Sequence, residues 1–331
     1  MIINTHVDDG GATLTWRSKY DSTLRALSER YPGTLDSTAM DRYLGMSFSY
    51  NHDTGAMAAS MYRSILKLLA TFSTSSLPEQ STPYTLDLFD ISEDLTPVDP
   101  KSYQRLVGGA IWLLKLRFET QLAVIMACSH NDTPTQGDLT KAIRLLAYLK
   151  RAAELGPTWY TEDGPILIAS CDAAFAVHPD TGGSQLSISR IGRDNAPFHV
   201  ISKIQTTKIS INPTHSEYNA FSLATEFIKY YRHYLAWLGY PQHDPTPLEN
   251  DCAPAFSILL APQFPKNSKN LLIQDRNVRA AYRDKILSPV HVLSKGFATD
   301  LNAKPCGPTD FKLKRAVILN IKANPDFAKY L

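Results

Sequence analysis

The chain has 331 residues, of which 44% are hydrophobic and 20% are charged, and its formal net charge is +2. This composition is typical of a globular protein with two or three packed units, and it excludes a disordered or collagen-like chain. The 34 basic and 32 acidic residues balance too closely to predict nucleic-acid binding, so that function must rest on local patches.

The spacing of the cysteines and the length of the apolar runs indicate which cellular compartments fit this chain. Cys128, Cys171, Cys252 and Cys306 lack the spacing of a zinc site or a disulfide framework, which favours a reducing, intracellular compartment. No apolar run reaches the roughly 18 residues of a membrane span, so we expect no membrane partner. The N-terminus, Met1–Asp9, lacks the pattern of a signal peptide. Its residues are typical of a strand that has already begun, which predicts a chain that starts inside a domain.

The first 60 residues predict a strand, a helix and a hairpin. Ile2–Val7 is strand-like, Asp8–Gly11 predicts a turn, and the apolar spacing of residues 18–30 predicts a helix. Alternating residues over Tyr43–Ala59, interrupted by an Asp-Thr-Gly turn, predict a β-hairpin.

The next 97 residues predict helices and one linker. Met61–Phe72 has the apolar period of an amphipathic helix. Residues 73–100 are rich in Ser, Thr, Pro and Asp, which predicts a linker. Tyr103–Cys128 and Gln136–Leu155 then predict a pair of helices.

From residue 163 the pattern changes to alternating strands and helices. Three strands are predicted first, followed by one long amphipathic helix over residues 214–238. Shorter elements follow: helices at 253–260, 275–287 and 311–321, and a strand at 290–293. This order predicts an α/β (α+β) domain built on a mixed sheet.

Four acids fall at the ends or middles of these elements. Asp172 lies within an apolar strand, where an unpaired charge is costly. Glu217 lies on the first turn of the long helix, Asp251 opens a helix, and Asp300 begins the last helical stretch. Such carboxylates can converge on one sheet edge, and hard oxygen ligands suit Mg²⁺. Two ions roughly 4 Å apart would activate a water and steady the leaving oxygen in phosphodiester cleavage.

Each of these acids except Asp172 also has a purely structural interpretation. Glu217 and Asp251 could stabilise a helix dipole, and Asp300 could be an N-cap. It is the combination of the four, in this order, that favours a metal site.

Basic and aromatic residues supply the candidate nucleic-acid contacts. Lys203 and Lys208 lie just before the long helix, where a groove that follows a phosphate backbone would pass. The cations and tyrosines of residues 229–234 fit the same role, but a solvated face with its aromatics in the core is the simpler interpretation. Three tryptophans are likewise expected in the core: Trp112, Trp159 and Trp237.

The ordered motifs resemble the reverse transcriptase–RNase H end of the polyprotein of copia-type (pseudovirus) LTR retrotransposons, over nearly the whole chain. In the first half the similar motifs are His6–Asp9, Tyr43–Gly45, Tyr103–Gly109, Lys115–Glu119 and Ala142–Lys150. In the second half they surround the four acids: Cys171–Phe175, Thr214–Tyr218, Asn250–Ala255, and Phe297–Asp300 with Lys304 and Pro305. Each match is weak alone, and the ordered series is specific.

The resemblance implies both a layout and an activity. It implies an RNase H-like mixed-sheet domain at 163–331, preceded by a truncated palm remnant (1–60), a thumb-like helix and linker (61–100) and a helical connection (101–157). It also implies magnesium- or manganese-dependent cleavage of the RNA strand of RNA–DNA hybrids, with two ions held by Asp172, Glu217, Asp251 and Asp300.

The sequence departs from the family at three places. Asp8 and Asp9 resemble one half of a polymerase metal site. We expect this half site to be vestigial, so polymerase activity is not expected from this chain alone. Asn277 aligns with a family histidine, and a neutral amide cannot shuttle a proton as imidazole can. His215 replaces a non-catalytic glutamate and is expected at the surface or in a helix cap.

Three functions therefore remain open. The first is an RNase H nuclease with an RNA–DNA hybrid as its partner. The second is a catalytically inactive remnant or scaffold that dimerises through the helices of residues 61–72 and 103–155. The third is a reverse transcriptase fragment that works only when it is joined to an N-terminal polymerase half.

Overall fold

The computed structural model describes most of the chain, namely residues 2–6, 9–13, 22, 25–26, 29–30, 41–51, 53–90, 94–160, 165–175, 183–192, 194–204, 210, 212–261, 272–295 and 297–331. Among the helices in these ranges, none has the length and hydropathy that a membrane crossing needs. The predicted helix at 18–30 lies mostly outside the described residues.

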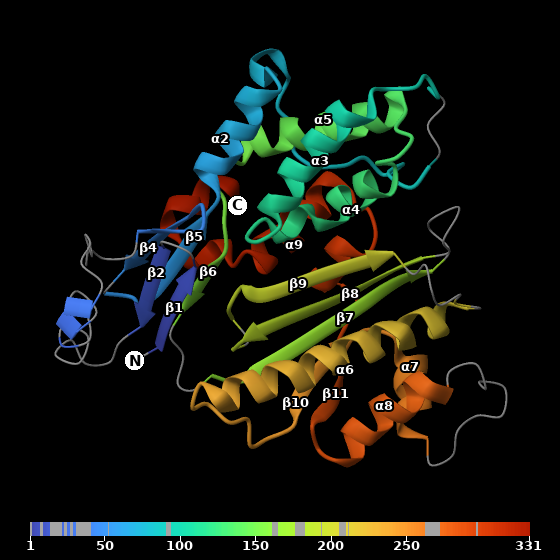
Figure 1. Cartoon of the computed structure of the whole chain (residues 1–331). Coiled ribbons are helices and arrows are strands. Elements are labelled where there is room, and N and C mark those ends of the chain that lie inside the picture. Colours follow the sequence, from blue (N-terminus) through green and yellow to red (C-terminus); the bar gives the residue numbers. More distant parts are fainter. Residues whose placement is uncertain are drawn as a thin grey trace.

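A five-stranded mixed sheet forms the centre of the molecule, in the order β11–β10–β7–β8–β9 (Figure 1). β8 is antiparallel to β7 and β9, whereas β10 is parallel to β7 and β11. The strands are β7 (Leu167–Phe175), β8 (Gly183–Ile191), β9 (Pro197–Ile204), β10 (Thr246–Asn250) and β11 (Leu287–His291). Three antiparallel strands, a long helix and two parallel strands make an RNase H-like fold, as the order of elements predicted.

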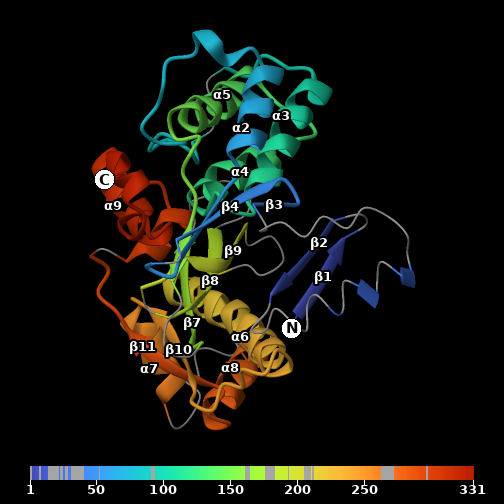
Figure 2. The same cartoon turned by 90° about the vertical axis from the view of Figure 1, so that its left-hand side faces the viewer.

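The two faces of this sheet are covered by different parts of the chain (Figures 1 and 2). One face packs against α6, α7 and α8 around Phe221, Leu248 and Val278. The helices are α6 (Pro213–Trp237), α7 (Ala253–Leu260) and α8 (Leu272–Arg283). The other face contacts η4 (Ala298–Asn302) and α4 (Gln121–Ser129), and its Ile188 and Val200 belong to a second core. Because β7 is covered on both faces, it is an almost continuous apolar run.

The second core joins the helices of the first half to the end of the chain. Phe311 of α9 (Pro308–Ile318) makes edge-to-face contacts with Tyr84 and Tyr148, at ring distances of 5.7 and 5.6 Å. The other elements of this part are α2 (Tyr62–Thr71), η1 (Thr74–Ser76), α3 (Pro100–Leu113), η2 (Phe118–Thr120), α5 (Gln136–Arg151), η5 (Ile321–Ala323) and η6 (Pro325–Tyr330). Residues 73–100 are therefore more than a linker, because Tyr84 and Leu88 are buried in this core.

A buried ion pair breaks the helix that was predicted over Tyr103–Cys128. Nε and Nη2 of Arg117 donate to Oε1 of Glu119 at 2.8 and 2.6 Å, and the Tyr148 hydroxyl donates to the same oxygen at 3.1 Å. Both charged side chains are 0% exposed. Apolar spacing alone predicted one helix, but this tight pairing requires the turn between α3 and α4.

Two smaller sheets complete the fold. β3 (Arg42–Tyr43), β4 (Met46–Asn51), β5 (Ala56–Ser60) and β6 (Thr158–Tyr160) form an antiparallel sheet, which confirms the hairpin prediction and adds β6. β1 (Ile2–His6) pairs with β2 (Asp9–Thr13). The prediction of a turn over Asp8–Gly11 was wrong from Asp9 onward, because those residues belong to β2.

Several aromatic residues that were expected in the core are exposed. Trp112 and Trp237 are 48% and 73% exposed, whereas Trp159 packs against the second core. Tyr230 and Tyr234, 61% and 45% exposed, stack on each other at 6.4 Å. For the aromatic residues of α6 the exposure follows from the length of the helix. Its 25 residues span roughly 37 Å, while the nine residues of β7 span roughly 30 Å, so the last turns of α6 extend beyond the sheet.

Candidate active site

Three carboxylates meet at one edge of the central sheet. Oxygens of Asp172, Glu217 and Asp251 all lie within 4.8 Å of one another, and we call these residues the carboxylate cluster. Asp172 lies in β7 and Asp251 directly follows β10, which is a parallel neighbour of β7, so both lie toward the same edge. Glu217 reaches this edge from the second turn of α6.

Asp172 is buried without a donor. It is 1% exposed, and within the described residues no amide, hydroxyl or cationic group donates a hydrogen bond to either carboxylate oxygen. Burial, followed by the charge of Glu217, raises its pKa well above the usual 3.8. A buried carboxylate in this state is costly unless a cation joins it, and its bare oxygens suit a hard metal ion.

Asn250 fixes the orientation of Glu217. Its side-chain amide donates to Oε2 of Glu217 at 3.0 Å and to the backbone oxygen of Cys171 at 2.8 Å. Its own oxygen accepts from the Cys252 amide at 2.8 Å, so the side chain is held from both ends. Burial raises the pKa of Glu217 to about 7, although the hydrogen bond from Asn250 opposes this shift. The sequence motif did not point to Asn250 as a site residue.

Asp300 lies beside the cluster but is paired with lysines. It is 5% exposed, and its carboxylate lies 2.7 Å from the ammonium of Lys304 and 3.0 Å from that of Lys314. Burial raises the pKa of Asp300, but its contacts with Lys304, Asp172 and Lys314 outweigh burial and hold the pKa below 3.8. Asp300 is therefore a neighbour of Asp172 that already has cationic partners.

Asn277 does not lie where the sequence alignment implied. Its amide bonds to Glu226 and Lys229, which are two to three turns farther along α6 than Glu217. His291 is the histidine that lies near the cluster: it ends β11, pairs in register with Asn250, and its Nε2 lies 3.1 Å from the Asp251 backbone oxygen. The signal in the sequence was its position at the end of a strand, nine residues before Asp300.

The remaining candidate residues are spread around the site. Lys203 is exposed near the end of β9, and its register with Gln185 and Ala173 places it on the face of the sheet opposite Asp172. His215 is buried rather than at the surface. Lys208 and Asp8 lie outside the described residues, and Asp9 is described only as part of β2.

Comparison with known proteins gives structural similarities only. No protein-family profile and no curated protein matches the sequence. The compost-derived LC11-RNase H1 aligns with 42% of this chain and 93% of its own, at 14% identity and a TM-score of 0.33. RNase H1 from the archaeon Halobacterium salinarum aligns with 41% and 90%, at 18% identity and a TM-score of 0.29.

A viral structure aligns over a longer part of the chain. The foamy viral protease–reverse transcriptase dRH, in complex with double-stranded DNA, aligns with 88% of this chain at 12% identity and a TM-score of 0.49. The alignment covers 46% of the viral chain, so this protein spans less than half of it. At such identities these similarities concern the fold and not the activity.

Proposed function

We propose that this protein is a ribonuclease H that hydrolyses the RNA strand of RNA–DNA hybrids. The observation that carries the proposal is the convergence of Asp172, Glu217 and Asp251 within 4.8 Å, around a buried Asp172 without a donor. With Asp300, these acids are proposed to hold two Mg²⁺ or Mn²⁺ ions. Such ions polarise the phosphate and lower the pKa of a bound water.

The other residues near the site receive supporting roles. Asn250 holds the Glu217 carboxylate in one orientation, because its amide is fixed to the backbone of β7. Lys304 neutralises part of the negative charge beside Asp300. His291 is exposed beside Asp251, so its ring is placed to carry a proton between the departing oxygen and solvent. Lys203 and Lys208 are proposed to contact phosphates of the hybrid.

We also propose that the chain is the C-terminal part of a copia-type polyprotein. Its domains would then have the boundaries that the motifs imply. The ordered series of motifs supports this assignment. In it, Asp8 and Asp9 are a vestigial polymerase metal site, and a polymerase half is a candidate partner.

Cleavage of an end-labelled RNA–DNA hybrid by the full chain, in Mg²⁺ and in Mn²⁺, tests the nuclease proposal. Wild type and the exposed control Asp132→Asn should cleave the RNA strand only, and a metal chelator should stop the reaction. Equal cleavage by wild type and by Asp172→Asn would point to a contaminating nuclease. No cleavage by folded wild type in either metal would contradict the proposal.

The exposed apolar side chains on α2 and α3 favour a second candidate, a scaffold that dimerises. Four of them are between 40% and 48% exposed: Tyr62, Leu66, Ile111 and Trp112. Exposed large apolar side chains are common at interfaces between protein chains. A concentration-dependent dimer that Trp112→Ser dissociates, together with absent hybrid cleavage, would favour this function over the nuclease.

A further inference from the structure

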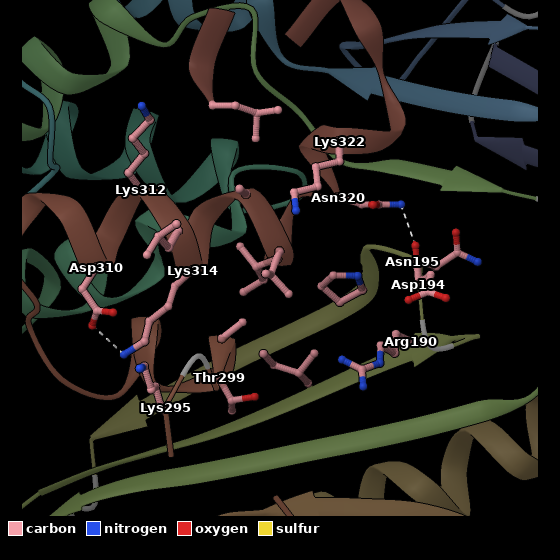
Figure 3. A pocket seen from close by; sticks show the side chains of 18 of the residues that line it. Arg190, Asp194, Asn195, Lys295, Thr299, Asp310, Lys312, Lys314, Asn320 and Lys322 are labelled. Carbon is pink, nitrogen blue, oxygen red and sulfur yellow. Dashed lines mark hydrogen bonds and ion pairs between the residues drawn. The ribbon is translucent and has the colours of Figure 1, made fainter. Parts of the chain in front are cut away.

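A cavity of about 970 Å³ lies between α9 and the face of the central sheet opposite α6 (Figure 3). We call it the α9 cavity. Its apolar lining includes Ile188 of β8, Pro197 of β9, and Leu313 and Val317 of α9. Its size is in the range of small-molecule sites, roughly 300–1,000 Å³.

The helix α9 presents an unburied apolar pair to this cavity. Leu313 and Val317 are one helical turn apart, which places them on the same face of α9. They are 64% and 56% exposed, whereas Phe311 and Ile318 of the same helix are buried in the second core. The helix is thus packed on one side and leaves an apolar surface uncovered on the side that lines the cavity.

Cationic side chains lie at both ends of the cavity. In Figure 3, Lys295 and Lys314 lie near Asp310 at one end, and Arg190 lies near Asp194 at the other. Five cationic and two acidic side chains line the cavity: Arg190, Lys295, Lys312, Lys314, Lys322, Asp194 and Asp310. The lining therefore combines apolar side chains with more cationic than acidic ones.

The exposed lysines are the ones that remain available to a ligand. Lys314 already pairs with Asp300 and Asp310 at 3.0 and 2.8 Å, and Arg190 pairs with Glu249 at 2.7 Å. The other three cations of the lining, Lys295, Lys312 and Lys322, are exposed and form no ion pair with any described residue.

The amides of the lining are committed to the fold. Oδ1 of Asn195 accepts from the Tyr160 amide at 2.7 Å, and Nδ2 of Asn320 donates to the Asp194 backbone oxygen at 2.7 Å. Recognition of a polar ligand therefore falls to the lysines rather than to these amides.

We propose that the α9 cavity binds a small amphiphilic anion. Its apolar body would cover Leu313 and Val317, and its phosphate or carboxylate would meet Lys295 or Lys322. A purely apolar molecule would gain nothing from these ammonium groups, and a small hydrated anion would not cover Leu313 and Val317. A nucleotide and a medium-chain fatty acid share this chemistry. The site is distinct from the carboxylate cluster and is independent of the proposed nuclease activity.

Fluorescence titration of the full chain with anilinonaphthalene sulfonate tests the site, in chelator and without nucleic acid. This probe combines an aromatic body with an anionic group, and its binding should be saturable and weaken as salt rises. Competition by ATP and by decanoate separates the two ligand sources. Displacement by either one supports the proposal and identifies the ligand class, and displacement by neither would overturn it.

Variants at the cavity decide whether the probe binds there. Val317→Asp places a carboxylate in the apolar part of the lining and should weaken binding at least tenfold. The matched control Leu260→Asp, at an exposed position of α7 on the other face of the sheet, should not weaken it. Lys295→Ala should weaken binding about two- to fivefold, as expected for an exposed charge pair. Lys101→Ala should leave it unchanged.

Equal weakening by Val317→Asp and Leu260→Asp would overturn the site. If Val317→Asp does not fold, the variant with both Lys295→Ala and Lys322→Ala decides, because both positions are exposed. Unchanged affinity in that variant would also overturn it.

Discussion

Two buried carboxylates differ in their hydrogen-bond partners: Glu119 in the helical part and Asp172 in the central sheet. Glu119 is 0% exposed and accepts two bonds from Arg117 and one from Tyr148. Asp172 is 1% exposed and has no such donor among the described residues. In the helical part the chain itself supplies the cation for its buried acid. At Asp172 no described residue does so, which supports the proposal that a cation from solution binds there.

A third buried acid makes the same point within the central sheet. Glu249 of β10 is 6% exposed, and its Oε2 accepts from the Ser170 hydroxyl and from Nη2 of Arg190, both at 2.7 Å. Glu249 lies only two residues before Asp251, so nearness to the sheet edge does not by itself leave an acid unpaired. Among the buried acids in the described part of the chain, Asp172 is the one whose carboxylate accepts no hydrogen bond from an amide, a hydroxyl or a cation.

The largest effect is expected from breaking the Arg117–Glu119 pair. Glu119→Gln leaves Arg117 buried without a counter-charge and should lower the free energy of unfolding by about 3–5 kcal/mol. Burial opposes ionisation of Asp172 in the folded state, which costs stability near neutral pH. Asp172→Asn removes this cost, so the free energy of unfolding should stay the same or rise. Urea unfolding followed by circular dichroism, in chelator near neutral pH, measures both.

A double variant controls for lost packing at this pair. Arg117→Met with Glu119→Leu removes both charges at once and should recover most of the stability that Glu119→Gln loses. Equal destabilisation by Glu119→Gln and Asp172→Asn would contradict the claim that only Glu119 is stabilised by partners within the fold.

The next effect is stabilisation by metal. Mg²⁺ or Mn²⁺ at about a hundred times its Kd should stabilise wild type by about 2.7 kcal/mol, and Asp172→Asn by much less. Thermal unfolding with and without a chelator measures this difference. An equal shift in both proteins would place the metal elsewhere.

The stabilisation by metal should depend on pH. The pKa of Glu217 is raised from 4.5 to about 7 in the folded protein, so the folded state binds more protons than the unfolded state between these values. Without metal, this group therefore makes stability fall as pH rises from about 4.5 to about 7. Metal competes with these protons, so its stabilisation should be larger at about pH 8 than at about pH 6. An equal shift at both would contradict the protonated state of Glu217.

A smaller effect is expected at His291. His291→Gln should lower kcat for hybrid cleavage roughly 10- to 100-fold, because a proton carrier is lost. Asn277→Ala, at a residue that contacts α6 two to three turns away from Glu217, should leave kcat unchanged. Loss of activity in Asn277→Ala but not in His291→Gln would instead support the role that the family resemblance gave to position 277.

The smallest effect is expected at Lys304. Its ammonium competes with a metal ion for Asp300, so Lys304→Ala should raise Mg²⁺ affinity about two- to fivefold. Calorimetric titration with Mg²⁺ measures this, with Lys101→Ala as the control. A lower affinity in Lys304→Ala would show that Lys304 supports the metal site rather than competing with it.

The sequence predicted the first three strands of the central sheet and α6 well, because their signals are local. The predicted strand at 290–293 begins three residues earlier, at Leu287. The apolar run of β7, the alternation of β8 and β9 and the long apolar period of α6 each specify one element. The same pattern placed Asp172 at a position where a charge has no simple structural role. Whether the four acids act as a metal site stays a prediction.

The failures came from contacts between distant residues. The break at Arg117 depends on Tyr148, which lies on another helix, and the burial of Tyr84 depends on Phe311 of α9. The exposure of Trp237 depends on how far α6 extends beyond the sheet. None of these relations is encoded in the local spacing of residues.

The most direct test compares hybrid cleavage by Asp172→Asn and Glu119→Gln, both assayed at a temperature where circular dichroism shows them folded. We expect Asp172→Asn to lose about a thousandfold or more in rate, since roughly 4 kcal/mol of transition-state stabilisation is removed. Glu119→Gln should cleave at close to the wild-type rate. Wild-type cleavage by folded Asp172→Asn would contradict the account, because the bare buried carboxylate would then have no part in the chemistry.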